Sequence, residues 1–444
     1  MRKLVLLAGL LAVGGTSLRA WQVDVHYLLT FWLATQAGFS RDAADDIAGG
    51  NQSLDESDYD AAISTMVWVL VRGDEGAAQA VRDNHFPSDG PIPSPPARRA
   101  VVANGPLARG PVVALIRPDP SSTALDTLGR GLHPFHDSWS HQGVPDVPLR
   151  PLRALRPGLS SAHPRARGGW RSEDADLTHL HVEEVVDLAR ETYLLLRQYL
   201  DQNPRRRIQP AADWAALEAT VREFAQARTK DEKDAWMATH IPLPPGAAAG
   251  ISGRLTLPGG PTGGVTRQFR ALEPPPDLVR PGEIAPALVD AANAFANAWI
   301  ANRNIGGAGE FVDVAGLADL FAGTPGPLGD RVPAALTEWS RKFLVMYLAT
   351  DHAQVNAAGH ADPGHPLYDT LPETAQTDGP FRAAGGLERP TFSAGHFAAL
   401  DDNPLAPGFA VALRLSDVPH EAIVLVWRQT GGRWAITAMF PVVG

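Results

Sequence analysis

The sequence predicts a mainly α-helical N-terminal domain followed by a smaller α+β domain. With 444 residues, the chain is longer than one hydrophobic core usually supports, so we expect two domains that each bury an apolar interior. Apolar residues recur at helical spacing in the N-terminal half, whereas apolar runs of strand length stand near the C-terminus. Proline and glycine accumulate between these regions, which predicts a linker.

The domain boundaries follow from these patterns. We expect a signal peptide over 1–20, the helical domain over 21–241, the linker over 242–282 and the α+β domain over 283–444. Within the helical domain, apolar spacing predicts helices at 23–36, 41–48, 61–72, 122–141, 178–200, 211–227 and 231–240. Ser40 is the expected N-cap of the second of these helices. The Pro- and Asp-rich stretch 84–96 is expected to be a loop.

The C-terminal domain is expected to begin with helices and to end in strands. Its predicted elements are helices at 284–302 and 333–352, and strands at 409–415, 422–427 and 434–440. Thr430-Gly431-Gly432 between the last two strands predicts a hairpin turn. A leading helix with Phe295 and Trp299, followed by a closing hairpin, resembles the cone-shaped fold of nuclear-transport-factor-2-like domains. The sequence assigns this domain neither a chemical role nor a protein partner.

The first twenty residues have the composition of a signal peptide. Arg2 and Lys3 form a basic start, residues 4–13 an apolar run, and Ala20 a small residue before a cleavage site. The apolar run is too short to span a bilayer, so we expect export to the periplasm or medium, with no integral membrane span after cleavage. An uncleaved anchor is the alternative, because Leu18 is an imperfect residue three positions before the cut.

Charge and cysteine content narrow the chemistry. The chain has no cysteine, so an exported form cannot use disulfides or thiolate metal sites, and any zinc must be held by histidine, carboxylate and backbone groups. Loss of Arg2, Lys3 and Arg19 with the signal peptide takes the net charge from −10 to −13. That balance offers no broad basic surface for a long polyanion such as nucleic acid.

Histidines cluster in the helical domain at spacings that suit metal binding. His133, Asp137 and His141 recur every four positions, which places two imidazoles and a carboxylate along one helical face. Pro134 is expected to bend this helix or to start a new one after Gly131. In contrast, three other histidines lie in a Gly/Pro-containing stretch without ligand spacing and are expected to be loop residues: His352, His360 and His365.

A second pair with four-residue spacing, His179 and Glu183, stands at the start of the next long helix. His181 with Glu184 is the competing pair. Imidazole ligands need an oriented hydrogen-bond partner, so unused groups nearby, including His136 and Asp176, are candidates for orienting groups rather than ligands.

These motifs together resemble the zinc-dependent phospholipase C and single-strand nuclease superfamily over residues 21–200. That superfamily begins at a mature N-terminal tryptophan, and in its nuclease branch a histidine follows five residues later, as His26 follows Trp21 here. Further motifs then occur in the family's order: an aspartate, a His-Phe pair, a His-x-x-x-Asp helix, a histidine and a His-x-x-x-acid pair. In this chain they are Asp55, His85-Phe86, His133 with Asp137, His141, and His179 with Glu183.

The resemblance implies a mainly helical fold with three zinc ions. Four residues would hold the first zinc: Asp55, His85, His133 and Asp137. Asp137 would bridge to a second zinc held by His26 and by the free amino nitrogen and carbonyl oxygen of Trp21. The third zinc would be held by His141, His179 and Glu183.

The chain also departs from the family pattern. The family's histidine after the His-x-x-x-Asp motif usually lies six residues past the aspartate, whereas His141 lies four past it, so His163 is an alternative ligand. Ser161-Ala162-His163, with Asp174 and Asp176 downstream, also resembles an uncharacterised bacterial branch of the superfamily. Further alternatives stand near their preferred counterparts: His181 for His179, and for Asp55 the acidic residues Asp24, Asp58 and Asp60.

The function expected from this resemblance is phosphodiester hydrolysis by a zinc-activated hydroxide. Three zinc ions with three carboxylates leave a cationic pocket that suits a phosphate diester, and Asp55 is the candidate for orienting the attacking water. We expect a phospholipid substrate rather than nucleic acid, as in phospholipase C. Two alternatives stay open: a single-strand nuclease or nucleotidase of the same fold, and a non-catalytic binding module stabilised by zinc.

Overall fold

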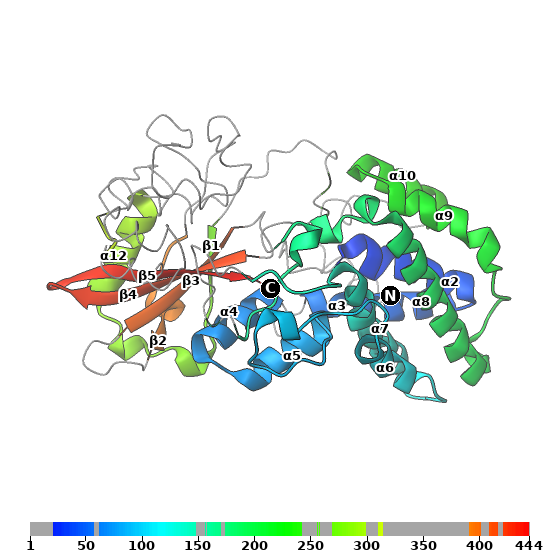
Figure 1. The fold of residues 1–444 in the computed structure, drawn as a ribbon, viewed down its shortest axis with the longest axis horizontal. Coiled ribbons are helices and arrows are strands. Elements are labelled where there is room, and N and C mark those ends of the chain that lie inside the picture. Colours follow the sequence, from blue (N-terminus) through cyan, green and yellow to red (C-terminus); the bar gives the residue numbers. More distant parts are fainter. Residues whose placement is uncertain are drawn as a thin grey trace, which may run out of the picture. The chain divides into compact units, whose positions relative to one another are not determined.

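The computed structural model describes residues 21–56, 62–147, 156, 158–169, 174–241, 255, 257, 269–298, 310–313, 390–400, 408–415 and 421–443. The chain divides into two compact units (Figure 1). Unit 1 is drawn from Met1–Thr65, Glu75–Asp146 and Ser161–Gly263, and unit 2 from Met66–Asp74, Val147–Ser160 and Gly264–Gly444. Several expectations fall outside the described residues: the signal peptide, Asp58, Asp60, Trp299, the 333–352 helix, His352, His360 and His365.

Unit 1 is helical, as the apolar spacing predicts. Its longer elements are η1 (Asp24–Leu29), α2 (Thr30–Ala37), α3 (Arg41–Glu56), α5 (Glu75–His85), α6 (Pro106–Leu115), α7 (Ala124–Ser140), α8 (Val182–Gln202), α9 (Trp214–Gln226) and α10 (Lys230–His240). Short 3₁₀ turns join them: η2 (Pro96–Arg98), η3 (Arg165–Arg167), η4 (Asp174–Asp176), η5 (Thr178–Leu180) and η6 (Pro204–Arg206). Helix α4 (Ala62–Arg72) belongs from Met66 onward to unit 2. Among the described residues, no helix has the length and apolar character needed to cross a membrane.

Helix α3 begins as predicted and continues further. The backbone N–H of Ala43 donates to Ser40 Oγ at 3.2 Å, so Ser40 caps the helix. The helix then runs through Gly49 and Gly50 to Glu56, eight residues past the expected end. This extension matters because its buried side carries two residues one turn apart, Asn51 and Asp55.

Helix α7 runs without interruption from Ala124 to Ser140, with Pro134 inside it. The alternative that a new helix starts after Gly131 is therefore wrong, and the expected bend at Pro134 stays a prediction. Proline removes one backbone hydrogen bond, but packing of the helix on its neighbours keeps the remaining turns in place. The four-residue spacing of His133 and Asp137 consequently lies on one continuous helical face.

Helices α3 and α7 pack closely against each other, and glycine makes this possible. A Cβ atom on Gly129 of α7 would overlap the carbonyl oxygen of Ile47 on α3, and a Cβ atom on Gly50 would overlap the carbonyl oxygen of Asp126. Each helix thus contributes a glycine where the partner's backbone passes. This close contact brings Asn51 of α3 beside the histidines of α7.

The N-terminal segment enters the core of unit 1 through a wide turn. Trp21 is fully buried, and η1 is a single π-helical stretch before α2. π-Helical turns often occur at functional sites, because the extra residue re-aims the side chains around it. Here the turn contains His26, which is also fully buried.

Unit 2 contains a small antiparallel sheet and helices. Its strands are β1 (Phe269–Leu272), β2 (Ala398–Leu400), β3 (Gly408–Leu415), β4 (Glu421–Thr430) and β5 (Arg433–Val443). The order is β1-β3-β4-β5, with β2 also paired to β3. Gly431 and Gly432 adopt positive φ values of 60° and 82° in the turn between β4 and β5, which confirms the predicted hairpin. Strand β1 lies within 242–282, where a linker was expected.

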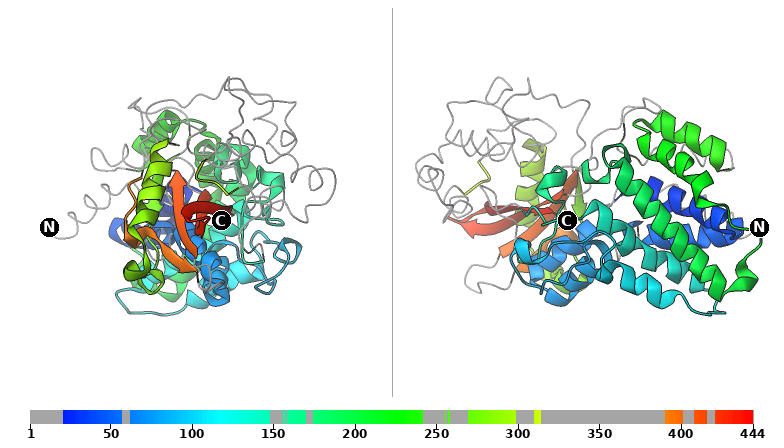
Figure 2. Two further views of the ribbon diagram at one scale, coloured as in Figure 1. Left: turned by 90° about the vertical axis from the view of Figure 1, so that its left-hand side faces the viewer. Right: turned by 45° about the vertical axis from the view of Figure 1, so that its right-hand side comes forward.

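One helix of unit 2 packs on this sheet. Helix α12 (Pro286–Ala296), drawn in yellow-green, lies against the strands (Figure 2). The ring of Phe295 contacts that of Trp427 edge-on, with centroids 5.9 Å apart. The smaller α+β region is therefore present. Its resemblance to nuclear-transport-factor-2-like domains stays a prediction.

Candidate metal centre

Five predicted ligands from four elements of unit 1 converge in one buried place. They form two overlapping sets that share His133, and in each set the ligand atoms lie within 4.8 Å of one another. We call these five residues group A: His26, Asp55, His85, His133 and Asp137. All but His85, which is 3% exposed, are fully buried.

The spacing of the group A atoms suits shared metal ions. Asp137 lies with Oδ1 3.1 Å from His26 Nε2, and with Oδ2 3.2 Å from His133 Nε2 and 3.3 Å from His85 Nδ1. In a tetrahedral zinc site with bonds of about 2.0–2.1 Å, neighbouring ligand atoms are about 3.3 Å apart. Neither carboxylate oxygen of Asp137 has a hydrogen-bond partner, although both are buried. A cation between these groups would satisfy them.

Asn51 fixes which ring nitrogens face the centre. Its backbone carbonyl accepts from Nδ1–H of His133 at 2.8 Å, and its side-chain Oδ1 accepts from Nδ1–H of His26 at 3.0 Å. In a neutral imidazole this leaves the lone pair on Nε2, and the Nε2 atoms are the ones that face Asp137. Asn51 is not among the predicted site residues, because the helix that carries both Asn51 and Asp55 was expected to end at residue 48.

His136 belongs to the same network as an orienting group. The Asn51 amide donates to its Nδ1 at 3.1 Å, and its Nε2–H donates to Thr192 Oγ1 at 2.9 Å. Both ring nitrogens are therefore occupied by hydrogen bonds. Burial, reinforced by the neighbouring His26, holds the pKa of His136 well below its usual value. The structure supports the orienting role expected for this residue over the less certain alternative that His136 is itself a metal ligand.

The two carboxylates of group A titrate differently in the metal-free protein. Burial raises the pKa of Asp55, against the attraction of the surrounding imidazoles. Burial also opposes ionisation of Asp137, but attraction to His133 and to the other two ring systems outweighs it and holds that pKa well below its usual value. Asp137 is thus the better-stabilised anion of the pair.

A second set of buried ligand atoms, which we call group B, consists of His141, His163 and Asp176. His163 Nε2 lies 3.4 Å from Asp176 Oδ2, and the rings of His141 and His163 are 5.0 Å apart. Nδ1–H of His141 donates to the His85 carbonyl. The other ring nitrogen of His141, Nε2, is buried without a hydrogen bond, so its lone pair is available to a metal ion in group B. His163 therefore joins His141 instead of replacing it, and burial lowers the pKa of His141 to about 4.

The predicted His-Phe pair links the two groups. His85 contributes its ring to group A, while its carbonyl orients His141 of group B. The next residue, Phe86, stacks on the His141 ring with centroids 4.0 Å apart and planes inclined by 13°. One dipeptide at the end of α5 therefore contacts both groups.

The structure does not bring His179 and Glu183 to group B. The expected single helical face does not form, because His179 lies in η5 and α8 begins only after the chain turns at His181. Glu183 is 77% exposed and forms an ion pair with Arg222 of α9. Burial lowers the pKa of His179, and the nearby positive charges of Arg228 and Lys233 lower it further.

Three other candidates are placed beside the groups without joining them. Asp24 forms an ion pair with Lys233 at 2.9 Å. Nε2–H of His181 donates to the Asp174 carbonyl at 3.0 Å, and its ring contacts Trp21 edge-on. The backbone nitrogen of Trp21 donates to Asp176 Oδ1 at 3.2 Å, so within the described residues it lies against group B. The resemblance had implied a zinc shared with His26.

Group B predicts a metal-binding result that differs from the one implied by the resemblance. Replacing Asp176 with asparagine should remove about one zinc per chain, because group B has only this carboxylate. Replacing Glu183 with glutamine should leave the zinc content unchanged, because Glu183 contacts an arginine at the surface. Elemental mass spectrometry on dialysed protein measures both. Loss of zinc from the Glu183 variant alone would contradict group B.

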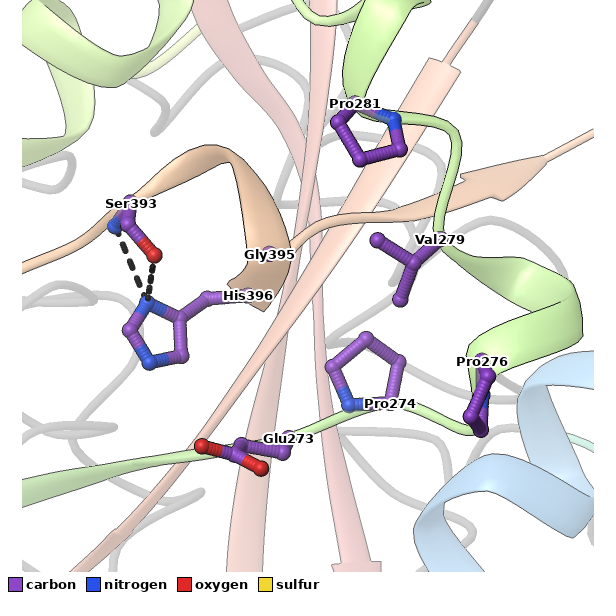
Figure 3. Close-up of a pocket in the computed structure, with 8 residues that line it drawn as sticks. All are labelled: Glu273, Pro274, Pro276, Val279, Pro281, Ser393, Gly395 and His396. Atoms are coloured by element: carbon purple, nitrogen blue, oxygen red, sulfur yellow. Dashed lines mark hydrogen bonds between the residues drawn. The ribbon is translucent and has the colours of Figure 1, made fainter.

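Unit 2 contains a separate hollow of about 450 Å³ (Figure 3). Prolines line much of it, and Ser393 and His396 stand on one turn at its side. The backbone N–H of Ser393 donates to His396 Nδ1 at 2.9 Å, which leaves the proton of a neutral ring on Nε2. This arrangement is also a helix cap, and it explains the fixed ring without any chemical role.

Comparison of the chain with protein-family models, with curated proteins and with solved structures finds no match in any of the three. The function of the chain is therefore inferred from the geometry of groups A and B and from the residue motifs.

Proposed function

We propose that the chain is a zinc-dependent phosphodiester hydrolase of the phospholipase C type. The observation that carries the proposal is the convergence of group A, where three imidazoles and two carboxylates face one another in a buried setting. Such a set is costly to bury unless a cation compensates the carboxylates. The resemblance of the residue motifs to the phospholipase C and nuclease superfamily supports the same proposal.

Zinc is the cation that best suits these donors. The ligand atoms are imidazole nitrogens and carboxylate oxygens, and the chain has no cysteine. Group A would hold two ions and group B a third. When bound, zinc lowers the pKa of a coordinated water toward about 7 and so supplies a nucleophile at neutral pH.

The charge of the loaded groups supports a phosphate ester as substrate. Three zinc ions carry six positive charges, whereas Asp55, Asp137 and Asp176 are the only acidic members of groups A and B. The excess positive charge favours an anionic substrate and stabilises negative charge that develops on phosphoryl oxygens. The acidic net charge of the chain, −10, favours a compact phosphodiester over a long polyanion.

Asp55 is the proposed catalytic residue. Gln52 donates to its Oδ2 at 3.4 Å, while its Oδ1 is buried without a hydrogen bond and lies 3.5 Å from His133 Nε2. Both oxygens therefore face the interior of group A, where a zinc-bound water would lie. Asp55 would orient the attacking water in addition to holding zinc.

The proposal is tested with zinc-loaded protein whose N-terminus is Trp21. We expect hydrolysis of bis(p-nitrophenyl) phosphate, faster release of phosphocholine from phosphatidylcholine vesicles than of nucleotides from single-stranded DNA, and loss of activity after chelation. Restoring zinc should restore the rate. Preferential cleavage of single-stranded DNA would establish the nuclease alternative, and no hydrolysis of any phosphoester would reject the hydrolase.

A zinc-stabilised module without catalysis is a second candidate, and burial favours it. His26, Asp55, His133 and Asp137 are all 0% exposed, as expected for closed structural sites. In that case zinc would raise stability by mass action without any activity. The vesicle and DNA assays above separate the two candidates.

We also propose that the chain is exported and cleaved before Trp21. The basic start, the short apolar run and Ala20 support a signal peptide. Cleavage would convert the Trp21 nitrogen, which donates to Asp176, into a free amine beside group B. Mass spectrometry of protein purified from the periplasm or medium gives the N-terminus directly.

A further inference from the structure

We propose that Lys233 is a positioning residue. It fixes the relative position of two segments that carry metal ligands, one with His26 and the other with Asp176. The inference rests on the proposed zinc binding of groups A and B, and it adds a residue outside both groups. Lys233 stands on α10 and is fully buried. A fully buried lysine is rare unless its charge is paired, so its partners show what it holds.

The three protons of the ammonium group have three partners. Nζ lies 2.9 Å from Asp24 Oδ2, donates to Thr178 Oγ1 at 2.9 Å and donates to the Phe224 carbonyl at 2.8 Å. It also lies 3.6 Å from the centre of the Phe224 ring. The Phe224 contacts fix the ammonium group to α9, and the other two reach the segments that carry ligands.

The first of these segments is η1. Asp24 is two residues before His26, and the wide turn that contains both is buried against the core. The other oxygen of Asp24 accepts from the backbone N–H of Val25 at 3.0 Å, so the carboxylate is tied to its own turn. Through Asp24, Lys233 therefore restrains the backbone that aims His26 at group A.

The second segment is the pair of short turns η4 and η5. Thr178 is two residues after Asp176, the carboxylate of group B, and is 1% exposed. Short 3₁₀ turns make few internal hydrogen bonds, so their position depends on side-chain contacts such as this one. The Trp21–Asp176 hydrogen bond joins the same two segments independently. Through its ammonium group, Lys233 thus connects the segment that carries His26 of group A with the segment that carries Asp176 of group B.

The test uses Lys233→Met, which keeps an unbranched side chain and removes the three donors. Because this change alone leaves the Asp24 carboxylate buried without its cation, the decisive protein is the double variant Lys233→Met/Asp24→Asn. Zinc affinity is measured by chelator competition and ligand geometry by the absorption spectrum of the Co²⁺-loaded protein. We expect about 10-fold or greater weakening of zinc binding and an altered Co²⁺ spectrum.

Trp236→Phe is the matched control on the same helix. Trp236 is 3% exposed and donates from Nε1 to the Thr220 carbonyl at 3.1 Å, so the change removes a partly buried hydrogen bond. It should lower the metal-free Tm while zinc affinity and the Co²⁺ spectrum stay as in the unmodified protein.

Two outcomes would overturn the positioning role. One is a double variant with unchanged zinc affinity and Co²⁺ spectrum, and the other is equal weakening by Trp236→Phe at equal loss of Tm. Failure of the proposed hydrolase is separate, because these measurements need no turnover. An unmodified protein that binds zinc but hydrolyses nothing would reject the hydrolase and leave the Lys233 result standing. An unmodified protein that binds no zinc would reject both.

Discussion

Replacing Asp137 with asparagine is expected to lower bound zinc from about three ions per chain to about one, and to abolish phosphodiester hydrolysis. The carboxylate faces all three imidazoles of group A, at 3.1–3.3 Å. Asparagine has nearly the same shape but no charge, and its amide nitrogen cannot ligate a cation. Asp55 would then be the one carboxylate for two ions, while group B keeps its own ligands.

The zinc content of the Asp137 variant is measured by elemental mass spectrometry after dialysis. Asp126→Asn is the control, because Asp126 is an exposed carboxylate on the same helix, outside both groups. It should retain all the zinc and activity. A variant of Asp137 that still binds three ions would show that group A does not share this carboxylate between metals.

The sequence predicted those features that depend on local pattern. Most helices of unit 1 follow from apolar spacing, and the closing hairpin follows from the two glycines at the turn. Helices α5 and α6 were not predicted. His133 and Asp137 were recognisable because both lie on one continuous helix, where a four-residue spacing has a fixed meaning.

Group B could not be predicted in the same way. The four-residue spacing of His179 and Glu183 places both on one face only within a continuous α-helix. Here His179 lies in a 3₁₀ turn, and the α-helix begins only after His181. Asp176 lies in a short turn, and its distance from His163 depends on tertiary packing. The roles of the supporting residues Asn51 and Lys233 arise from contacts between segments distant in the sequence, so neither belongs to a sequence motif.

The contact between α3 and α7 provides the second large expected effect. Gly50→Ala should lower the free energy of unfolding by about 2–3 kcal/mol, because the added Cβ overlaps the Asp126 carbonyl and must push the helices apart. Displacement of α3 would also move Asn51 and Asp55 away from the histidines of α7. We therefore expect weaker zinc binding together with lower stability, measured by urea unfolding of metal-free protein and by chelator competition.

The neighbouring residue offers a matched control. Gly49 lies on the same helix, and a Cβ atom there would meet nothing within 4 Å. Gly49→Ala should raise the free energy of unfolding by about 0.5–1 kcal/mol, because alanine loses less backbone freedom than glycine when a helix forms. Zinc affinity should not change. Opposite signs at adjacent positions would locate the cause in the α3–α7 contact, whereas stabilisation by both substitutions would mean that the helices can separate without disturbing the metal centre.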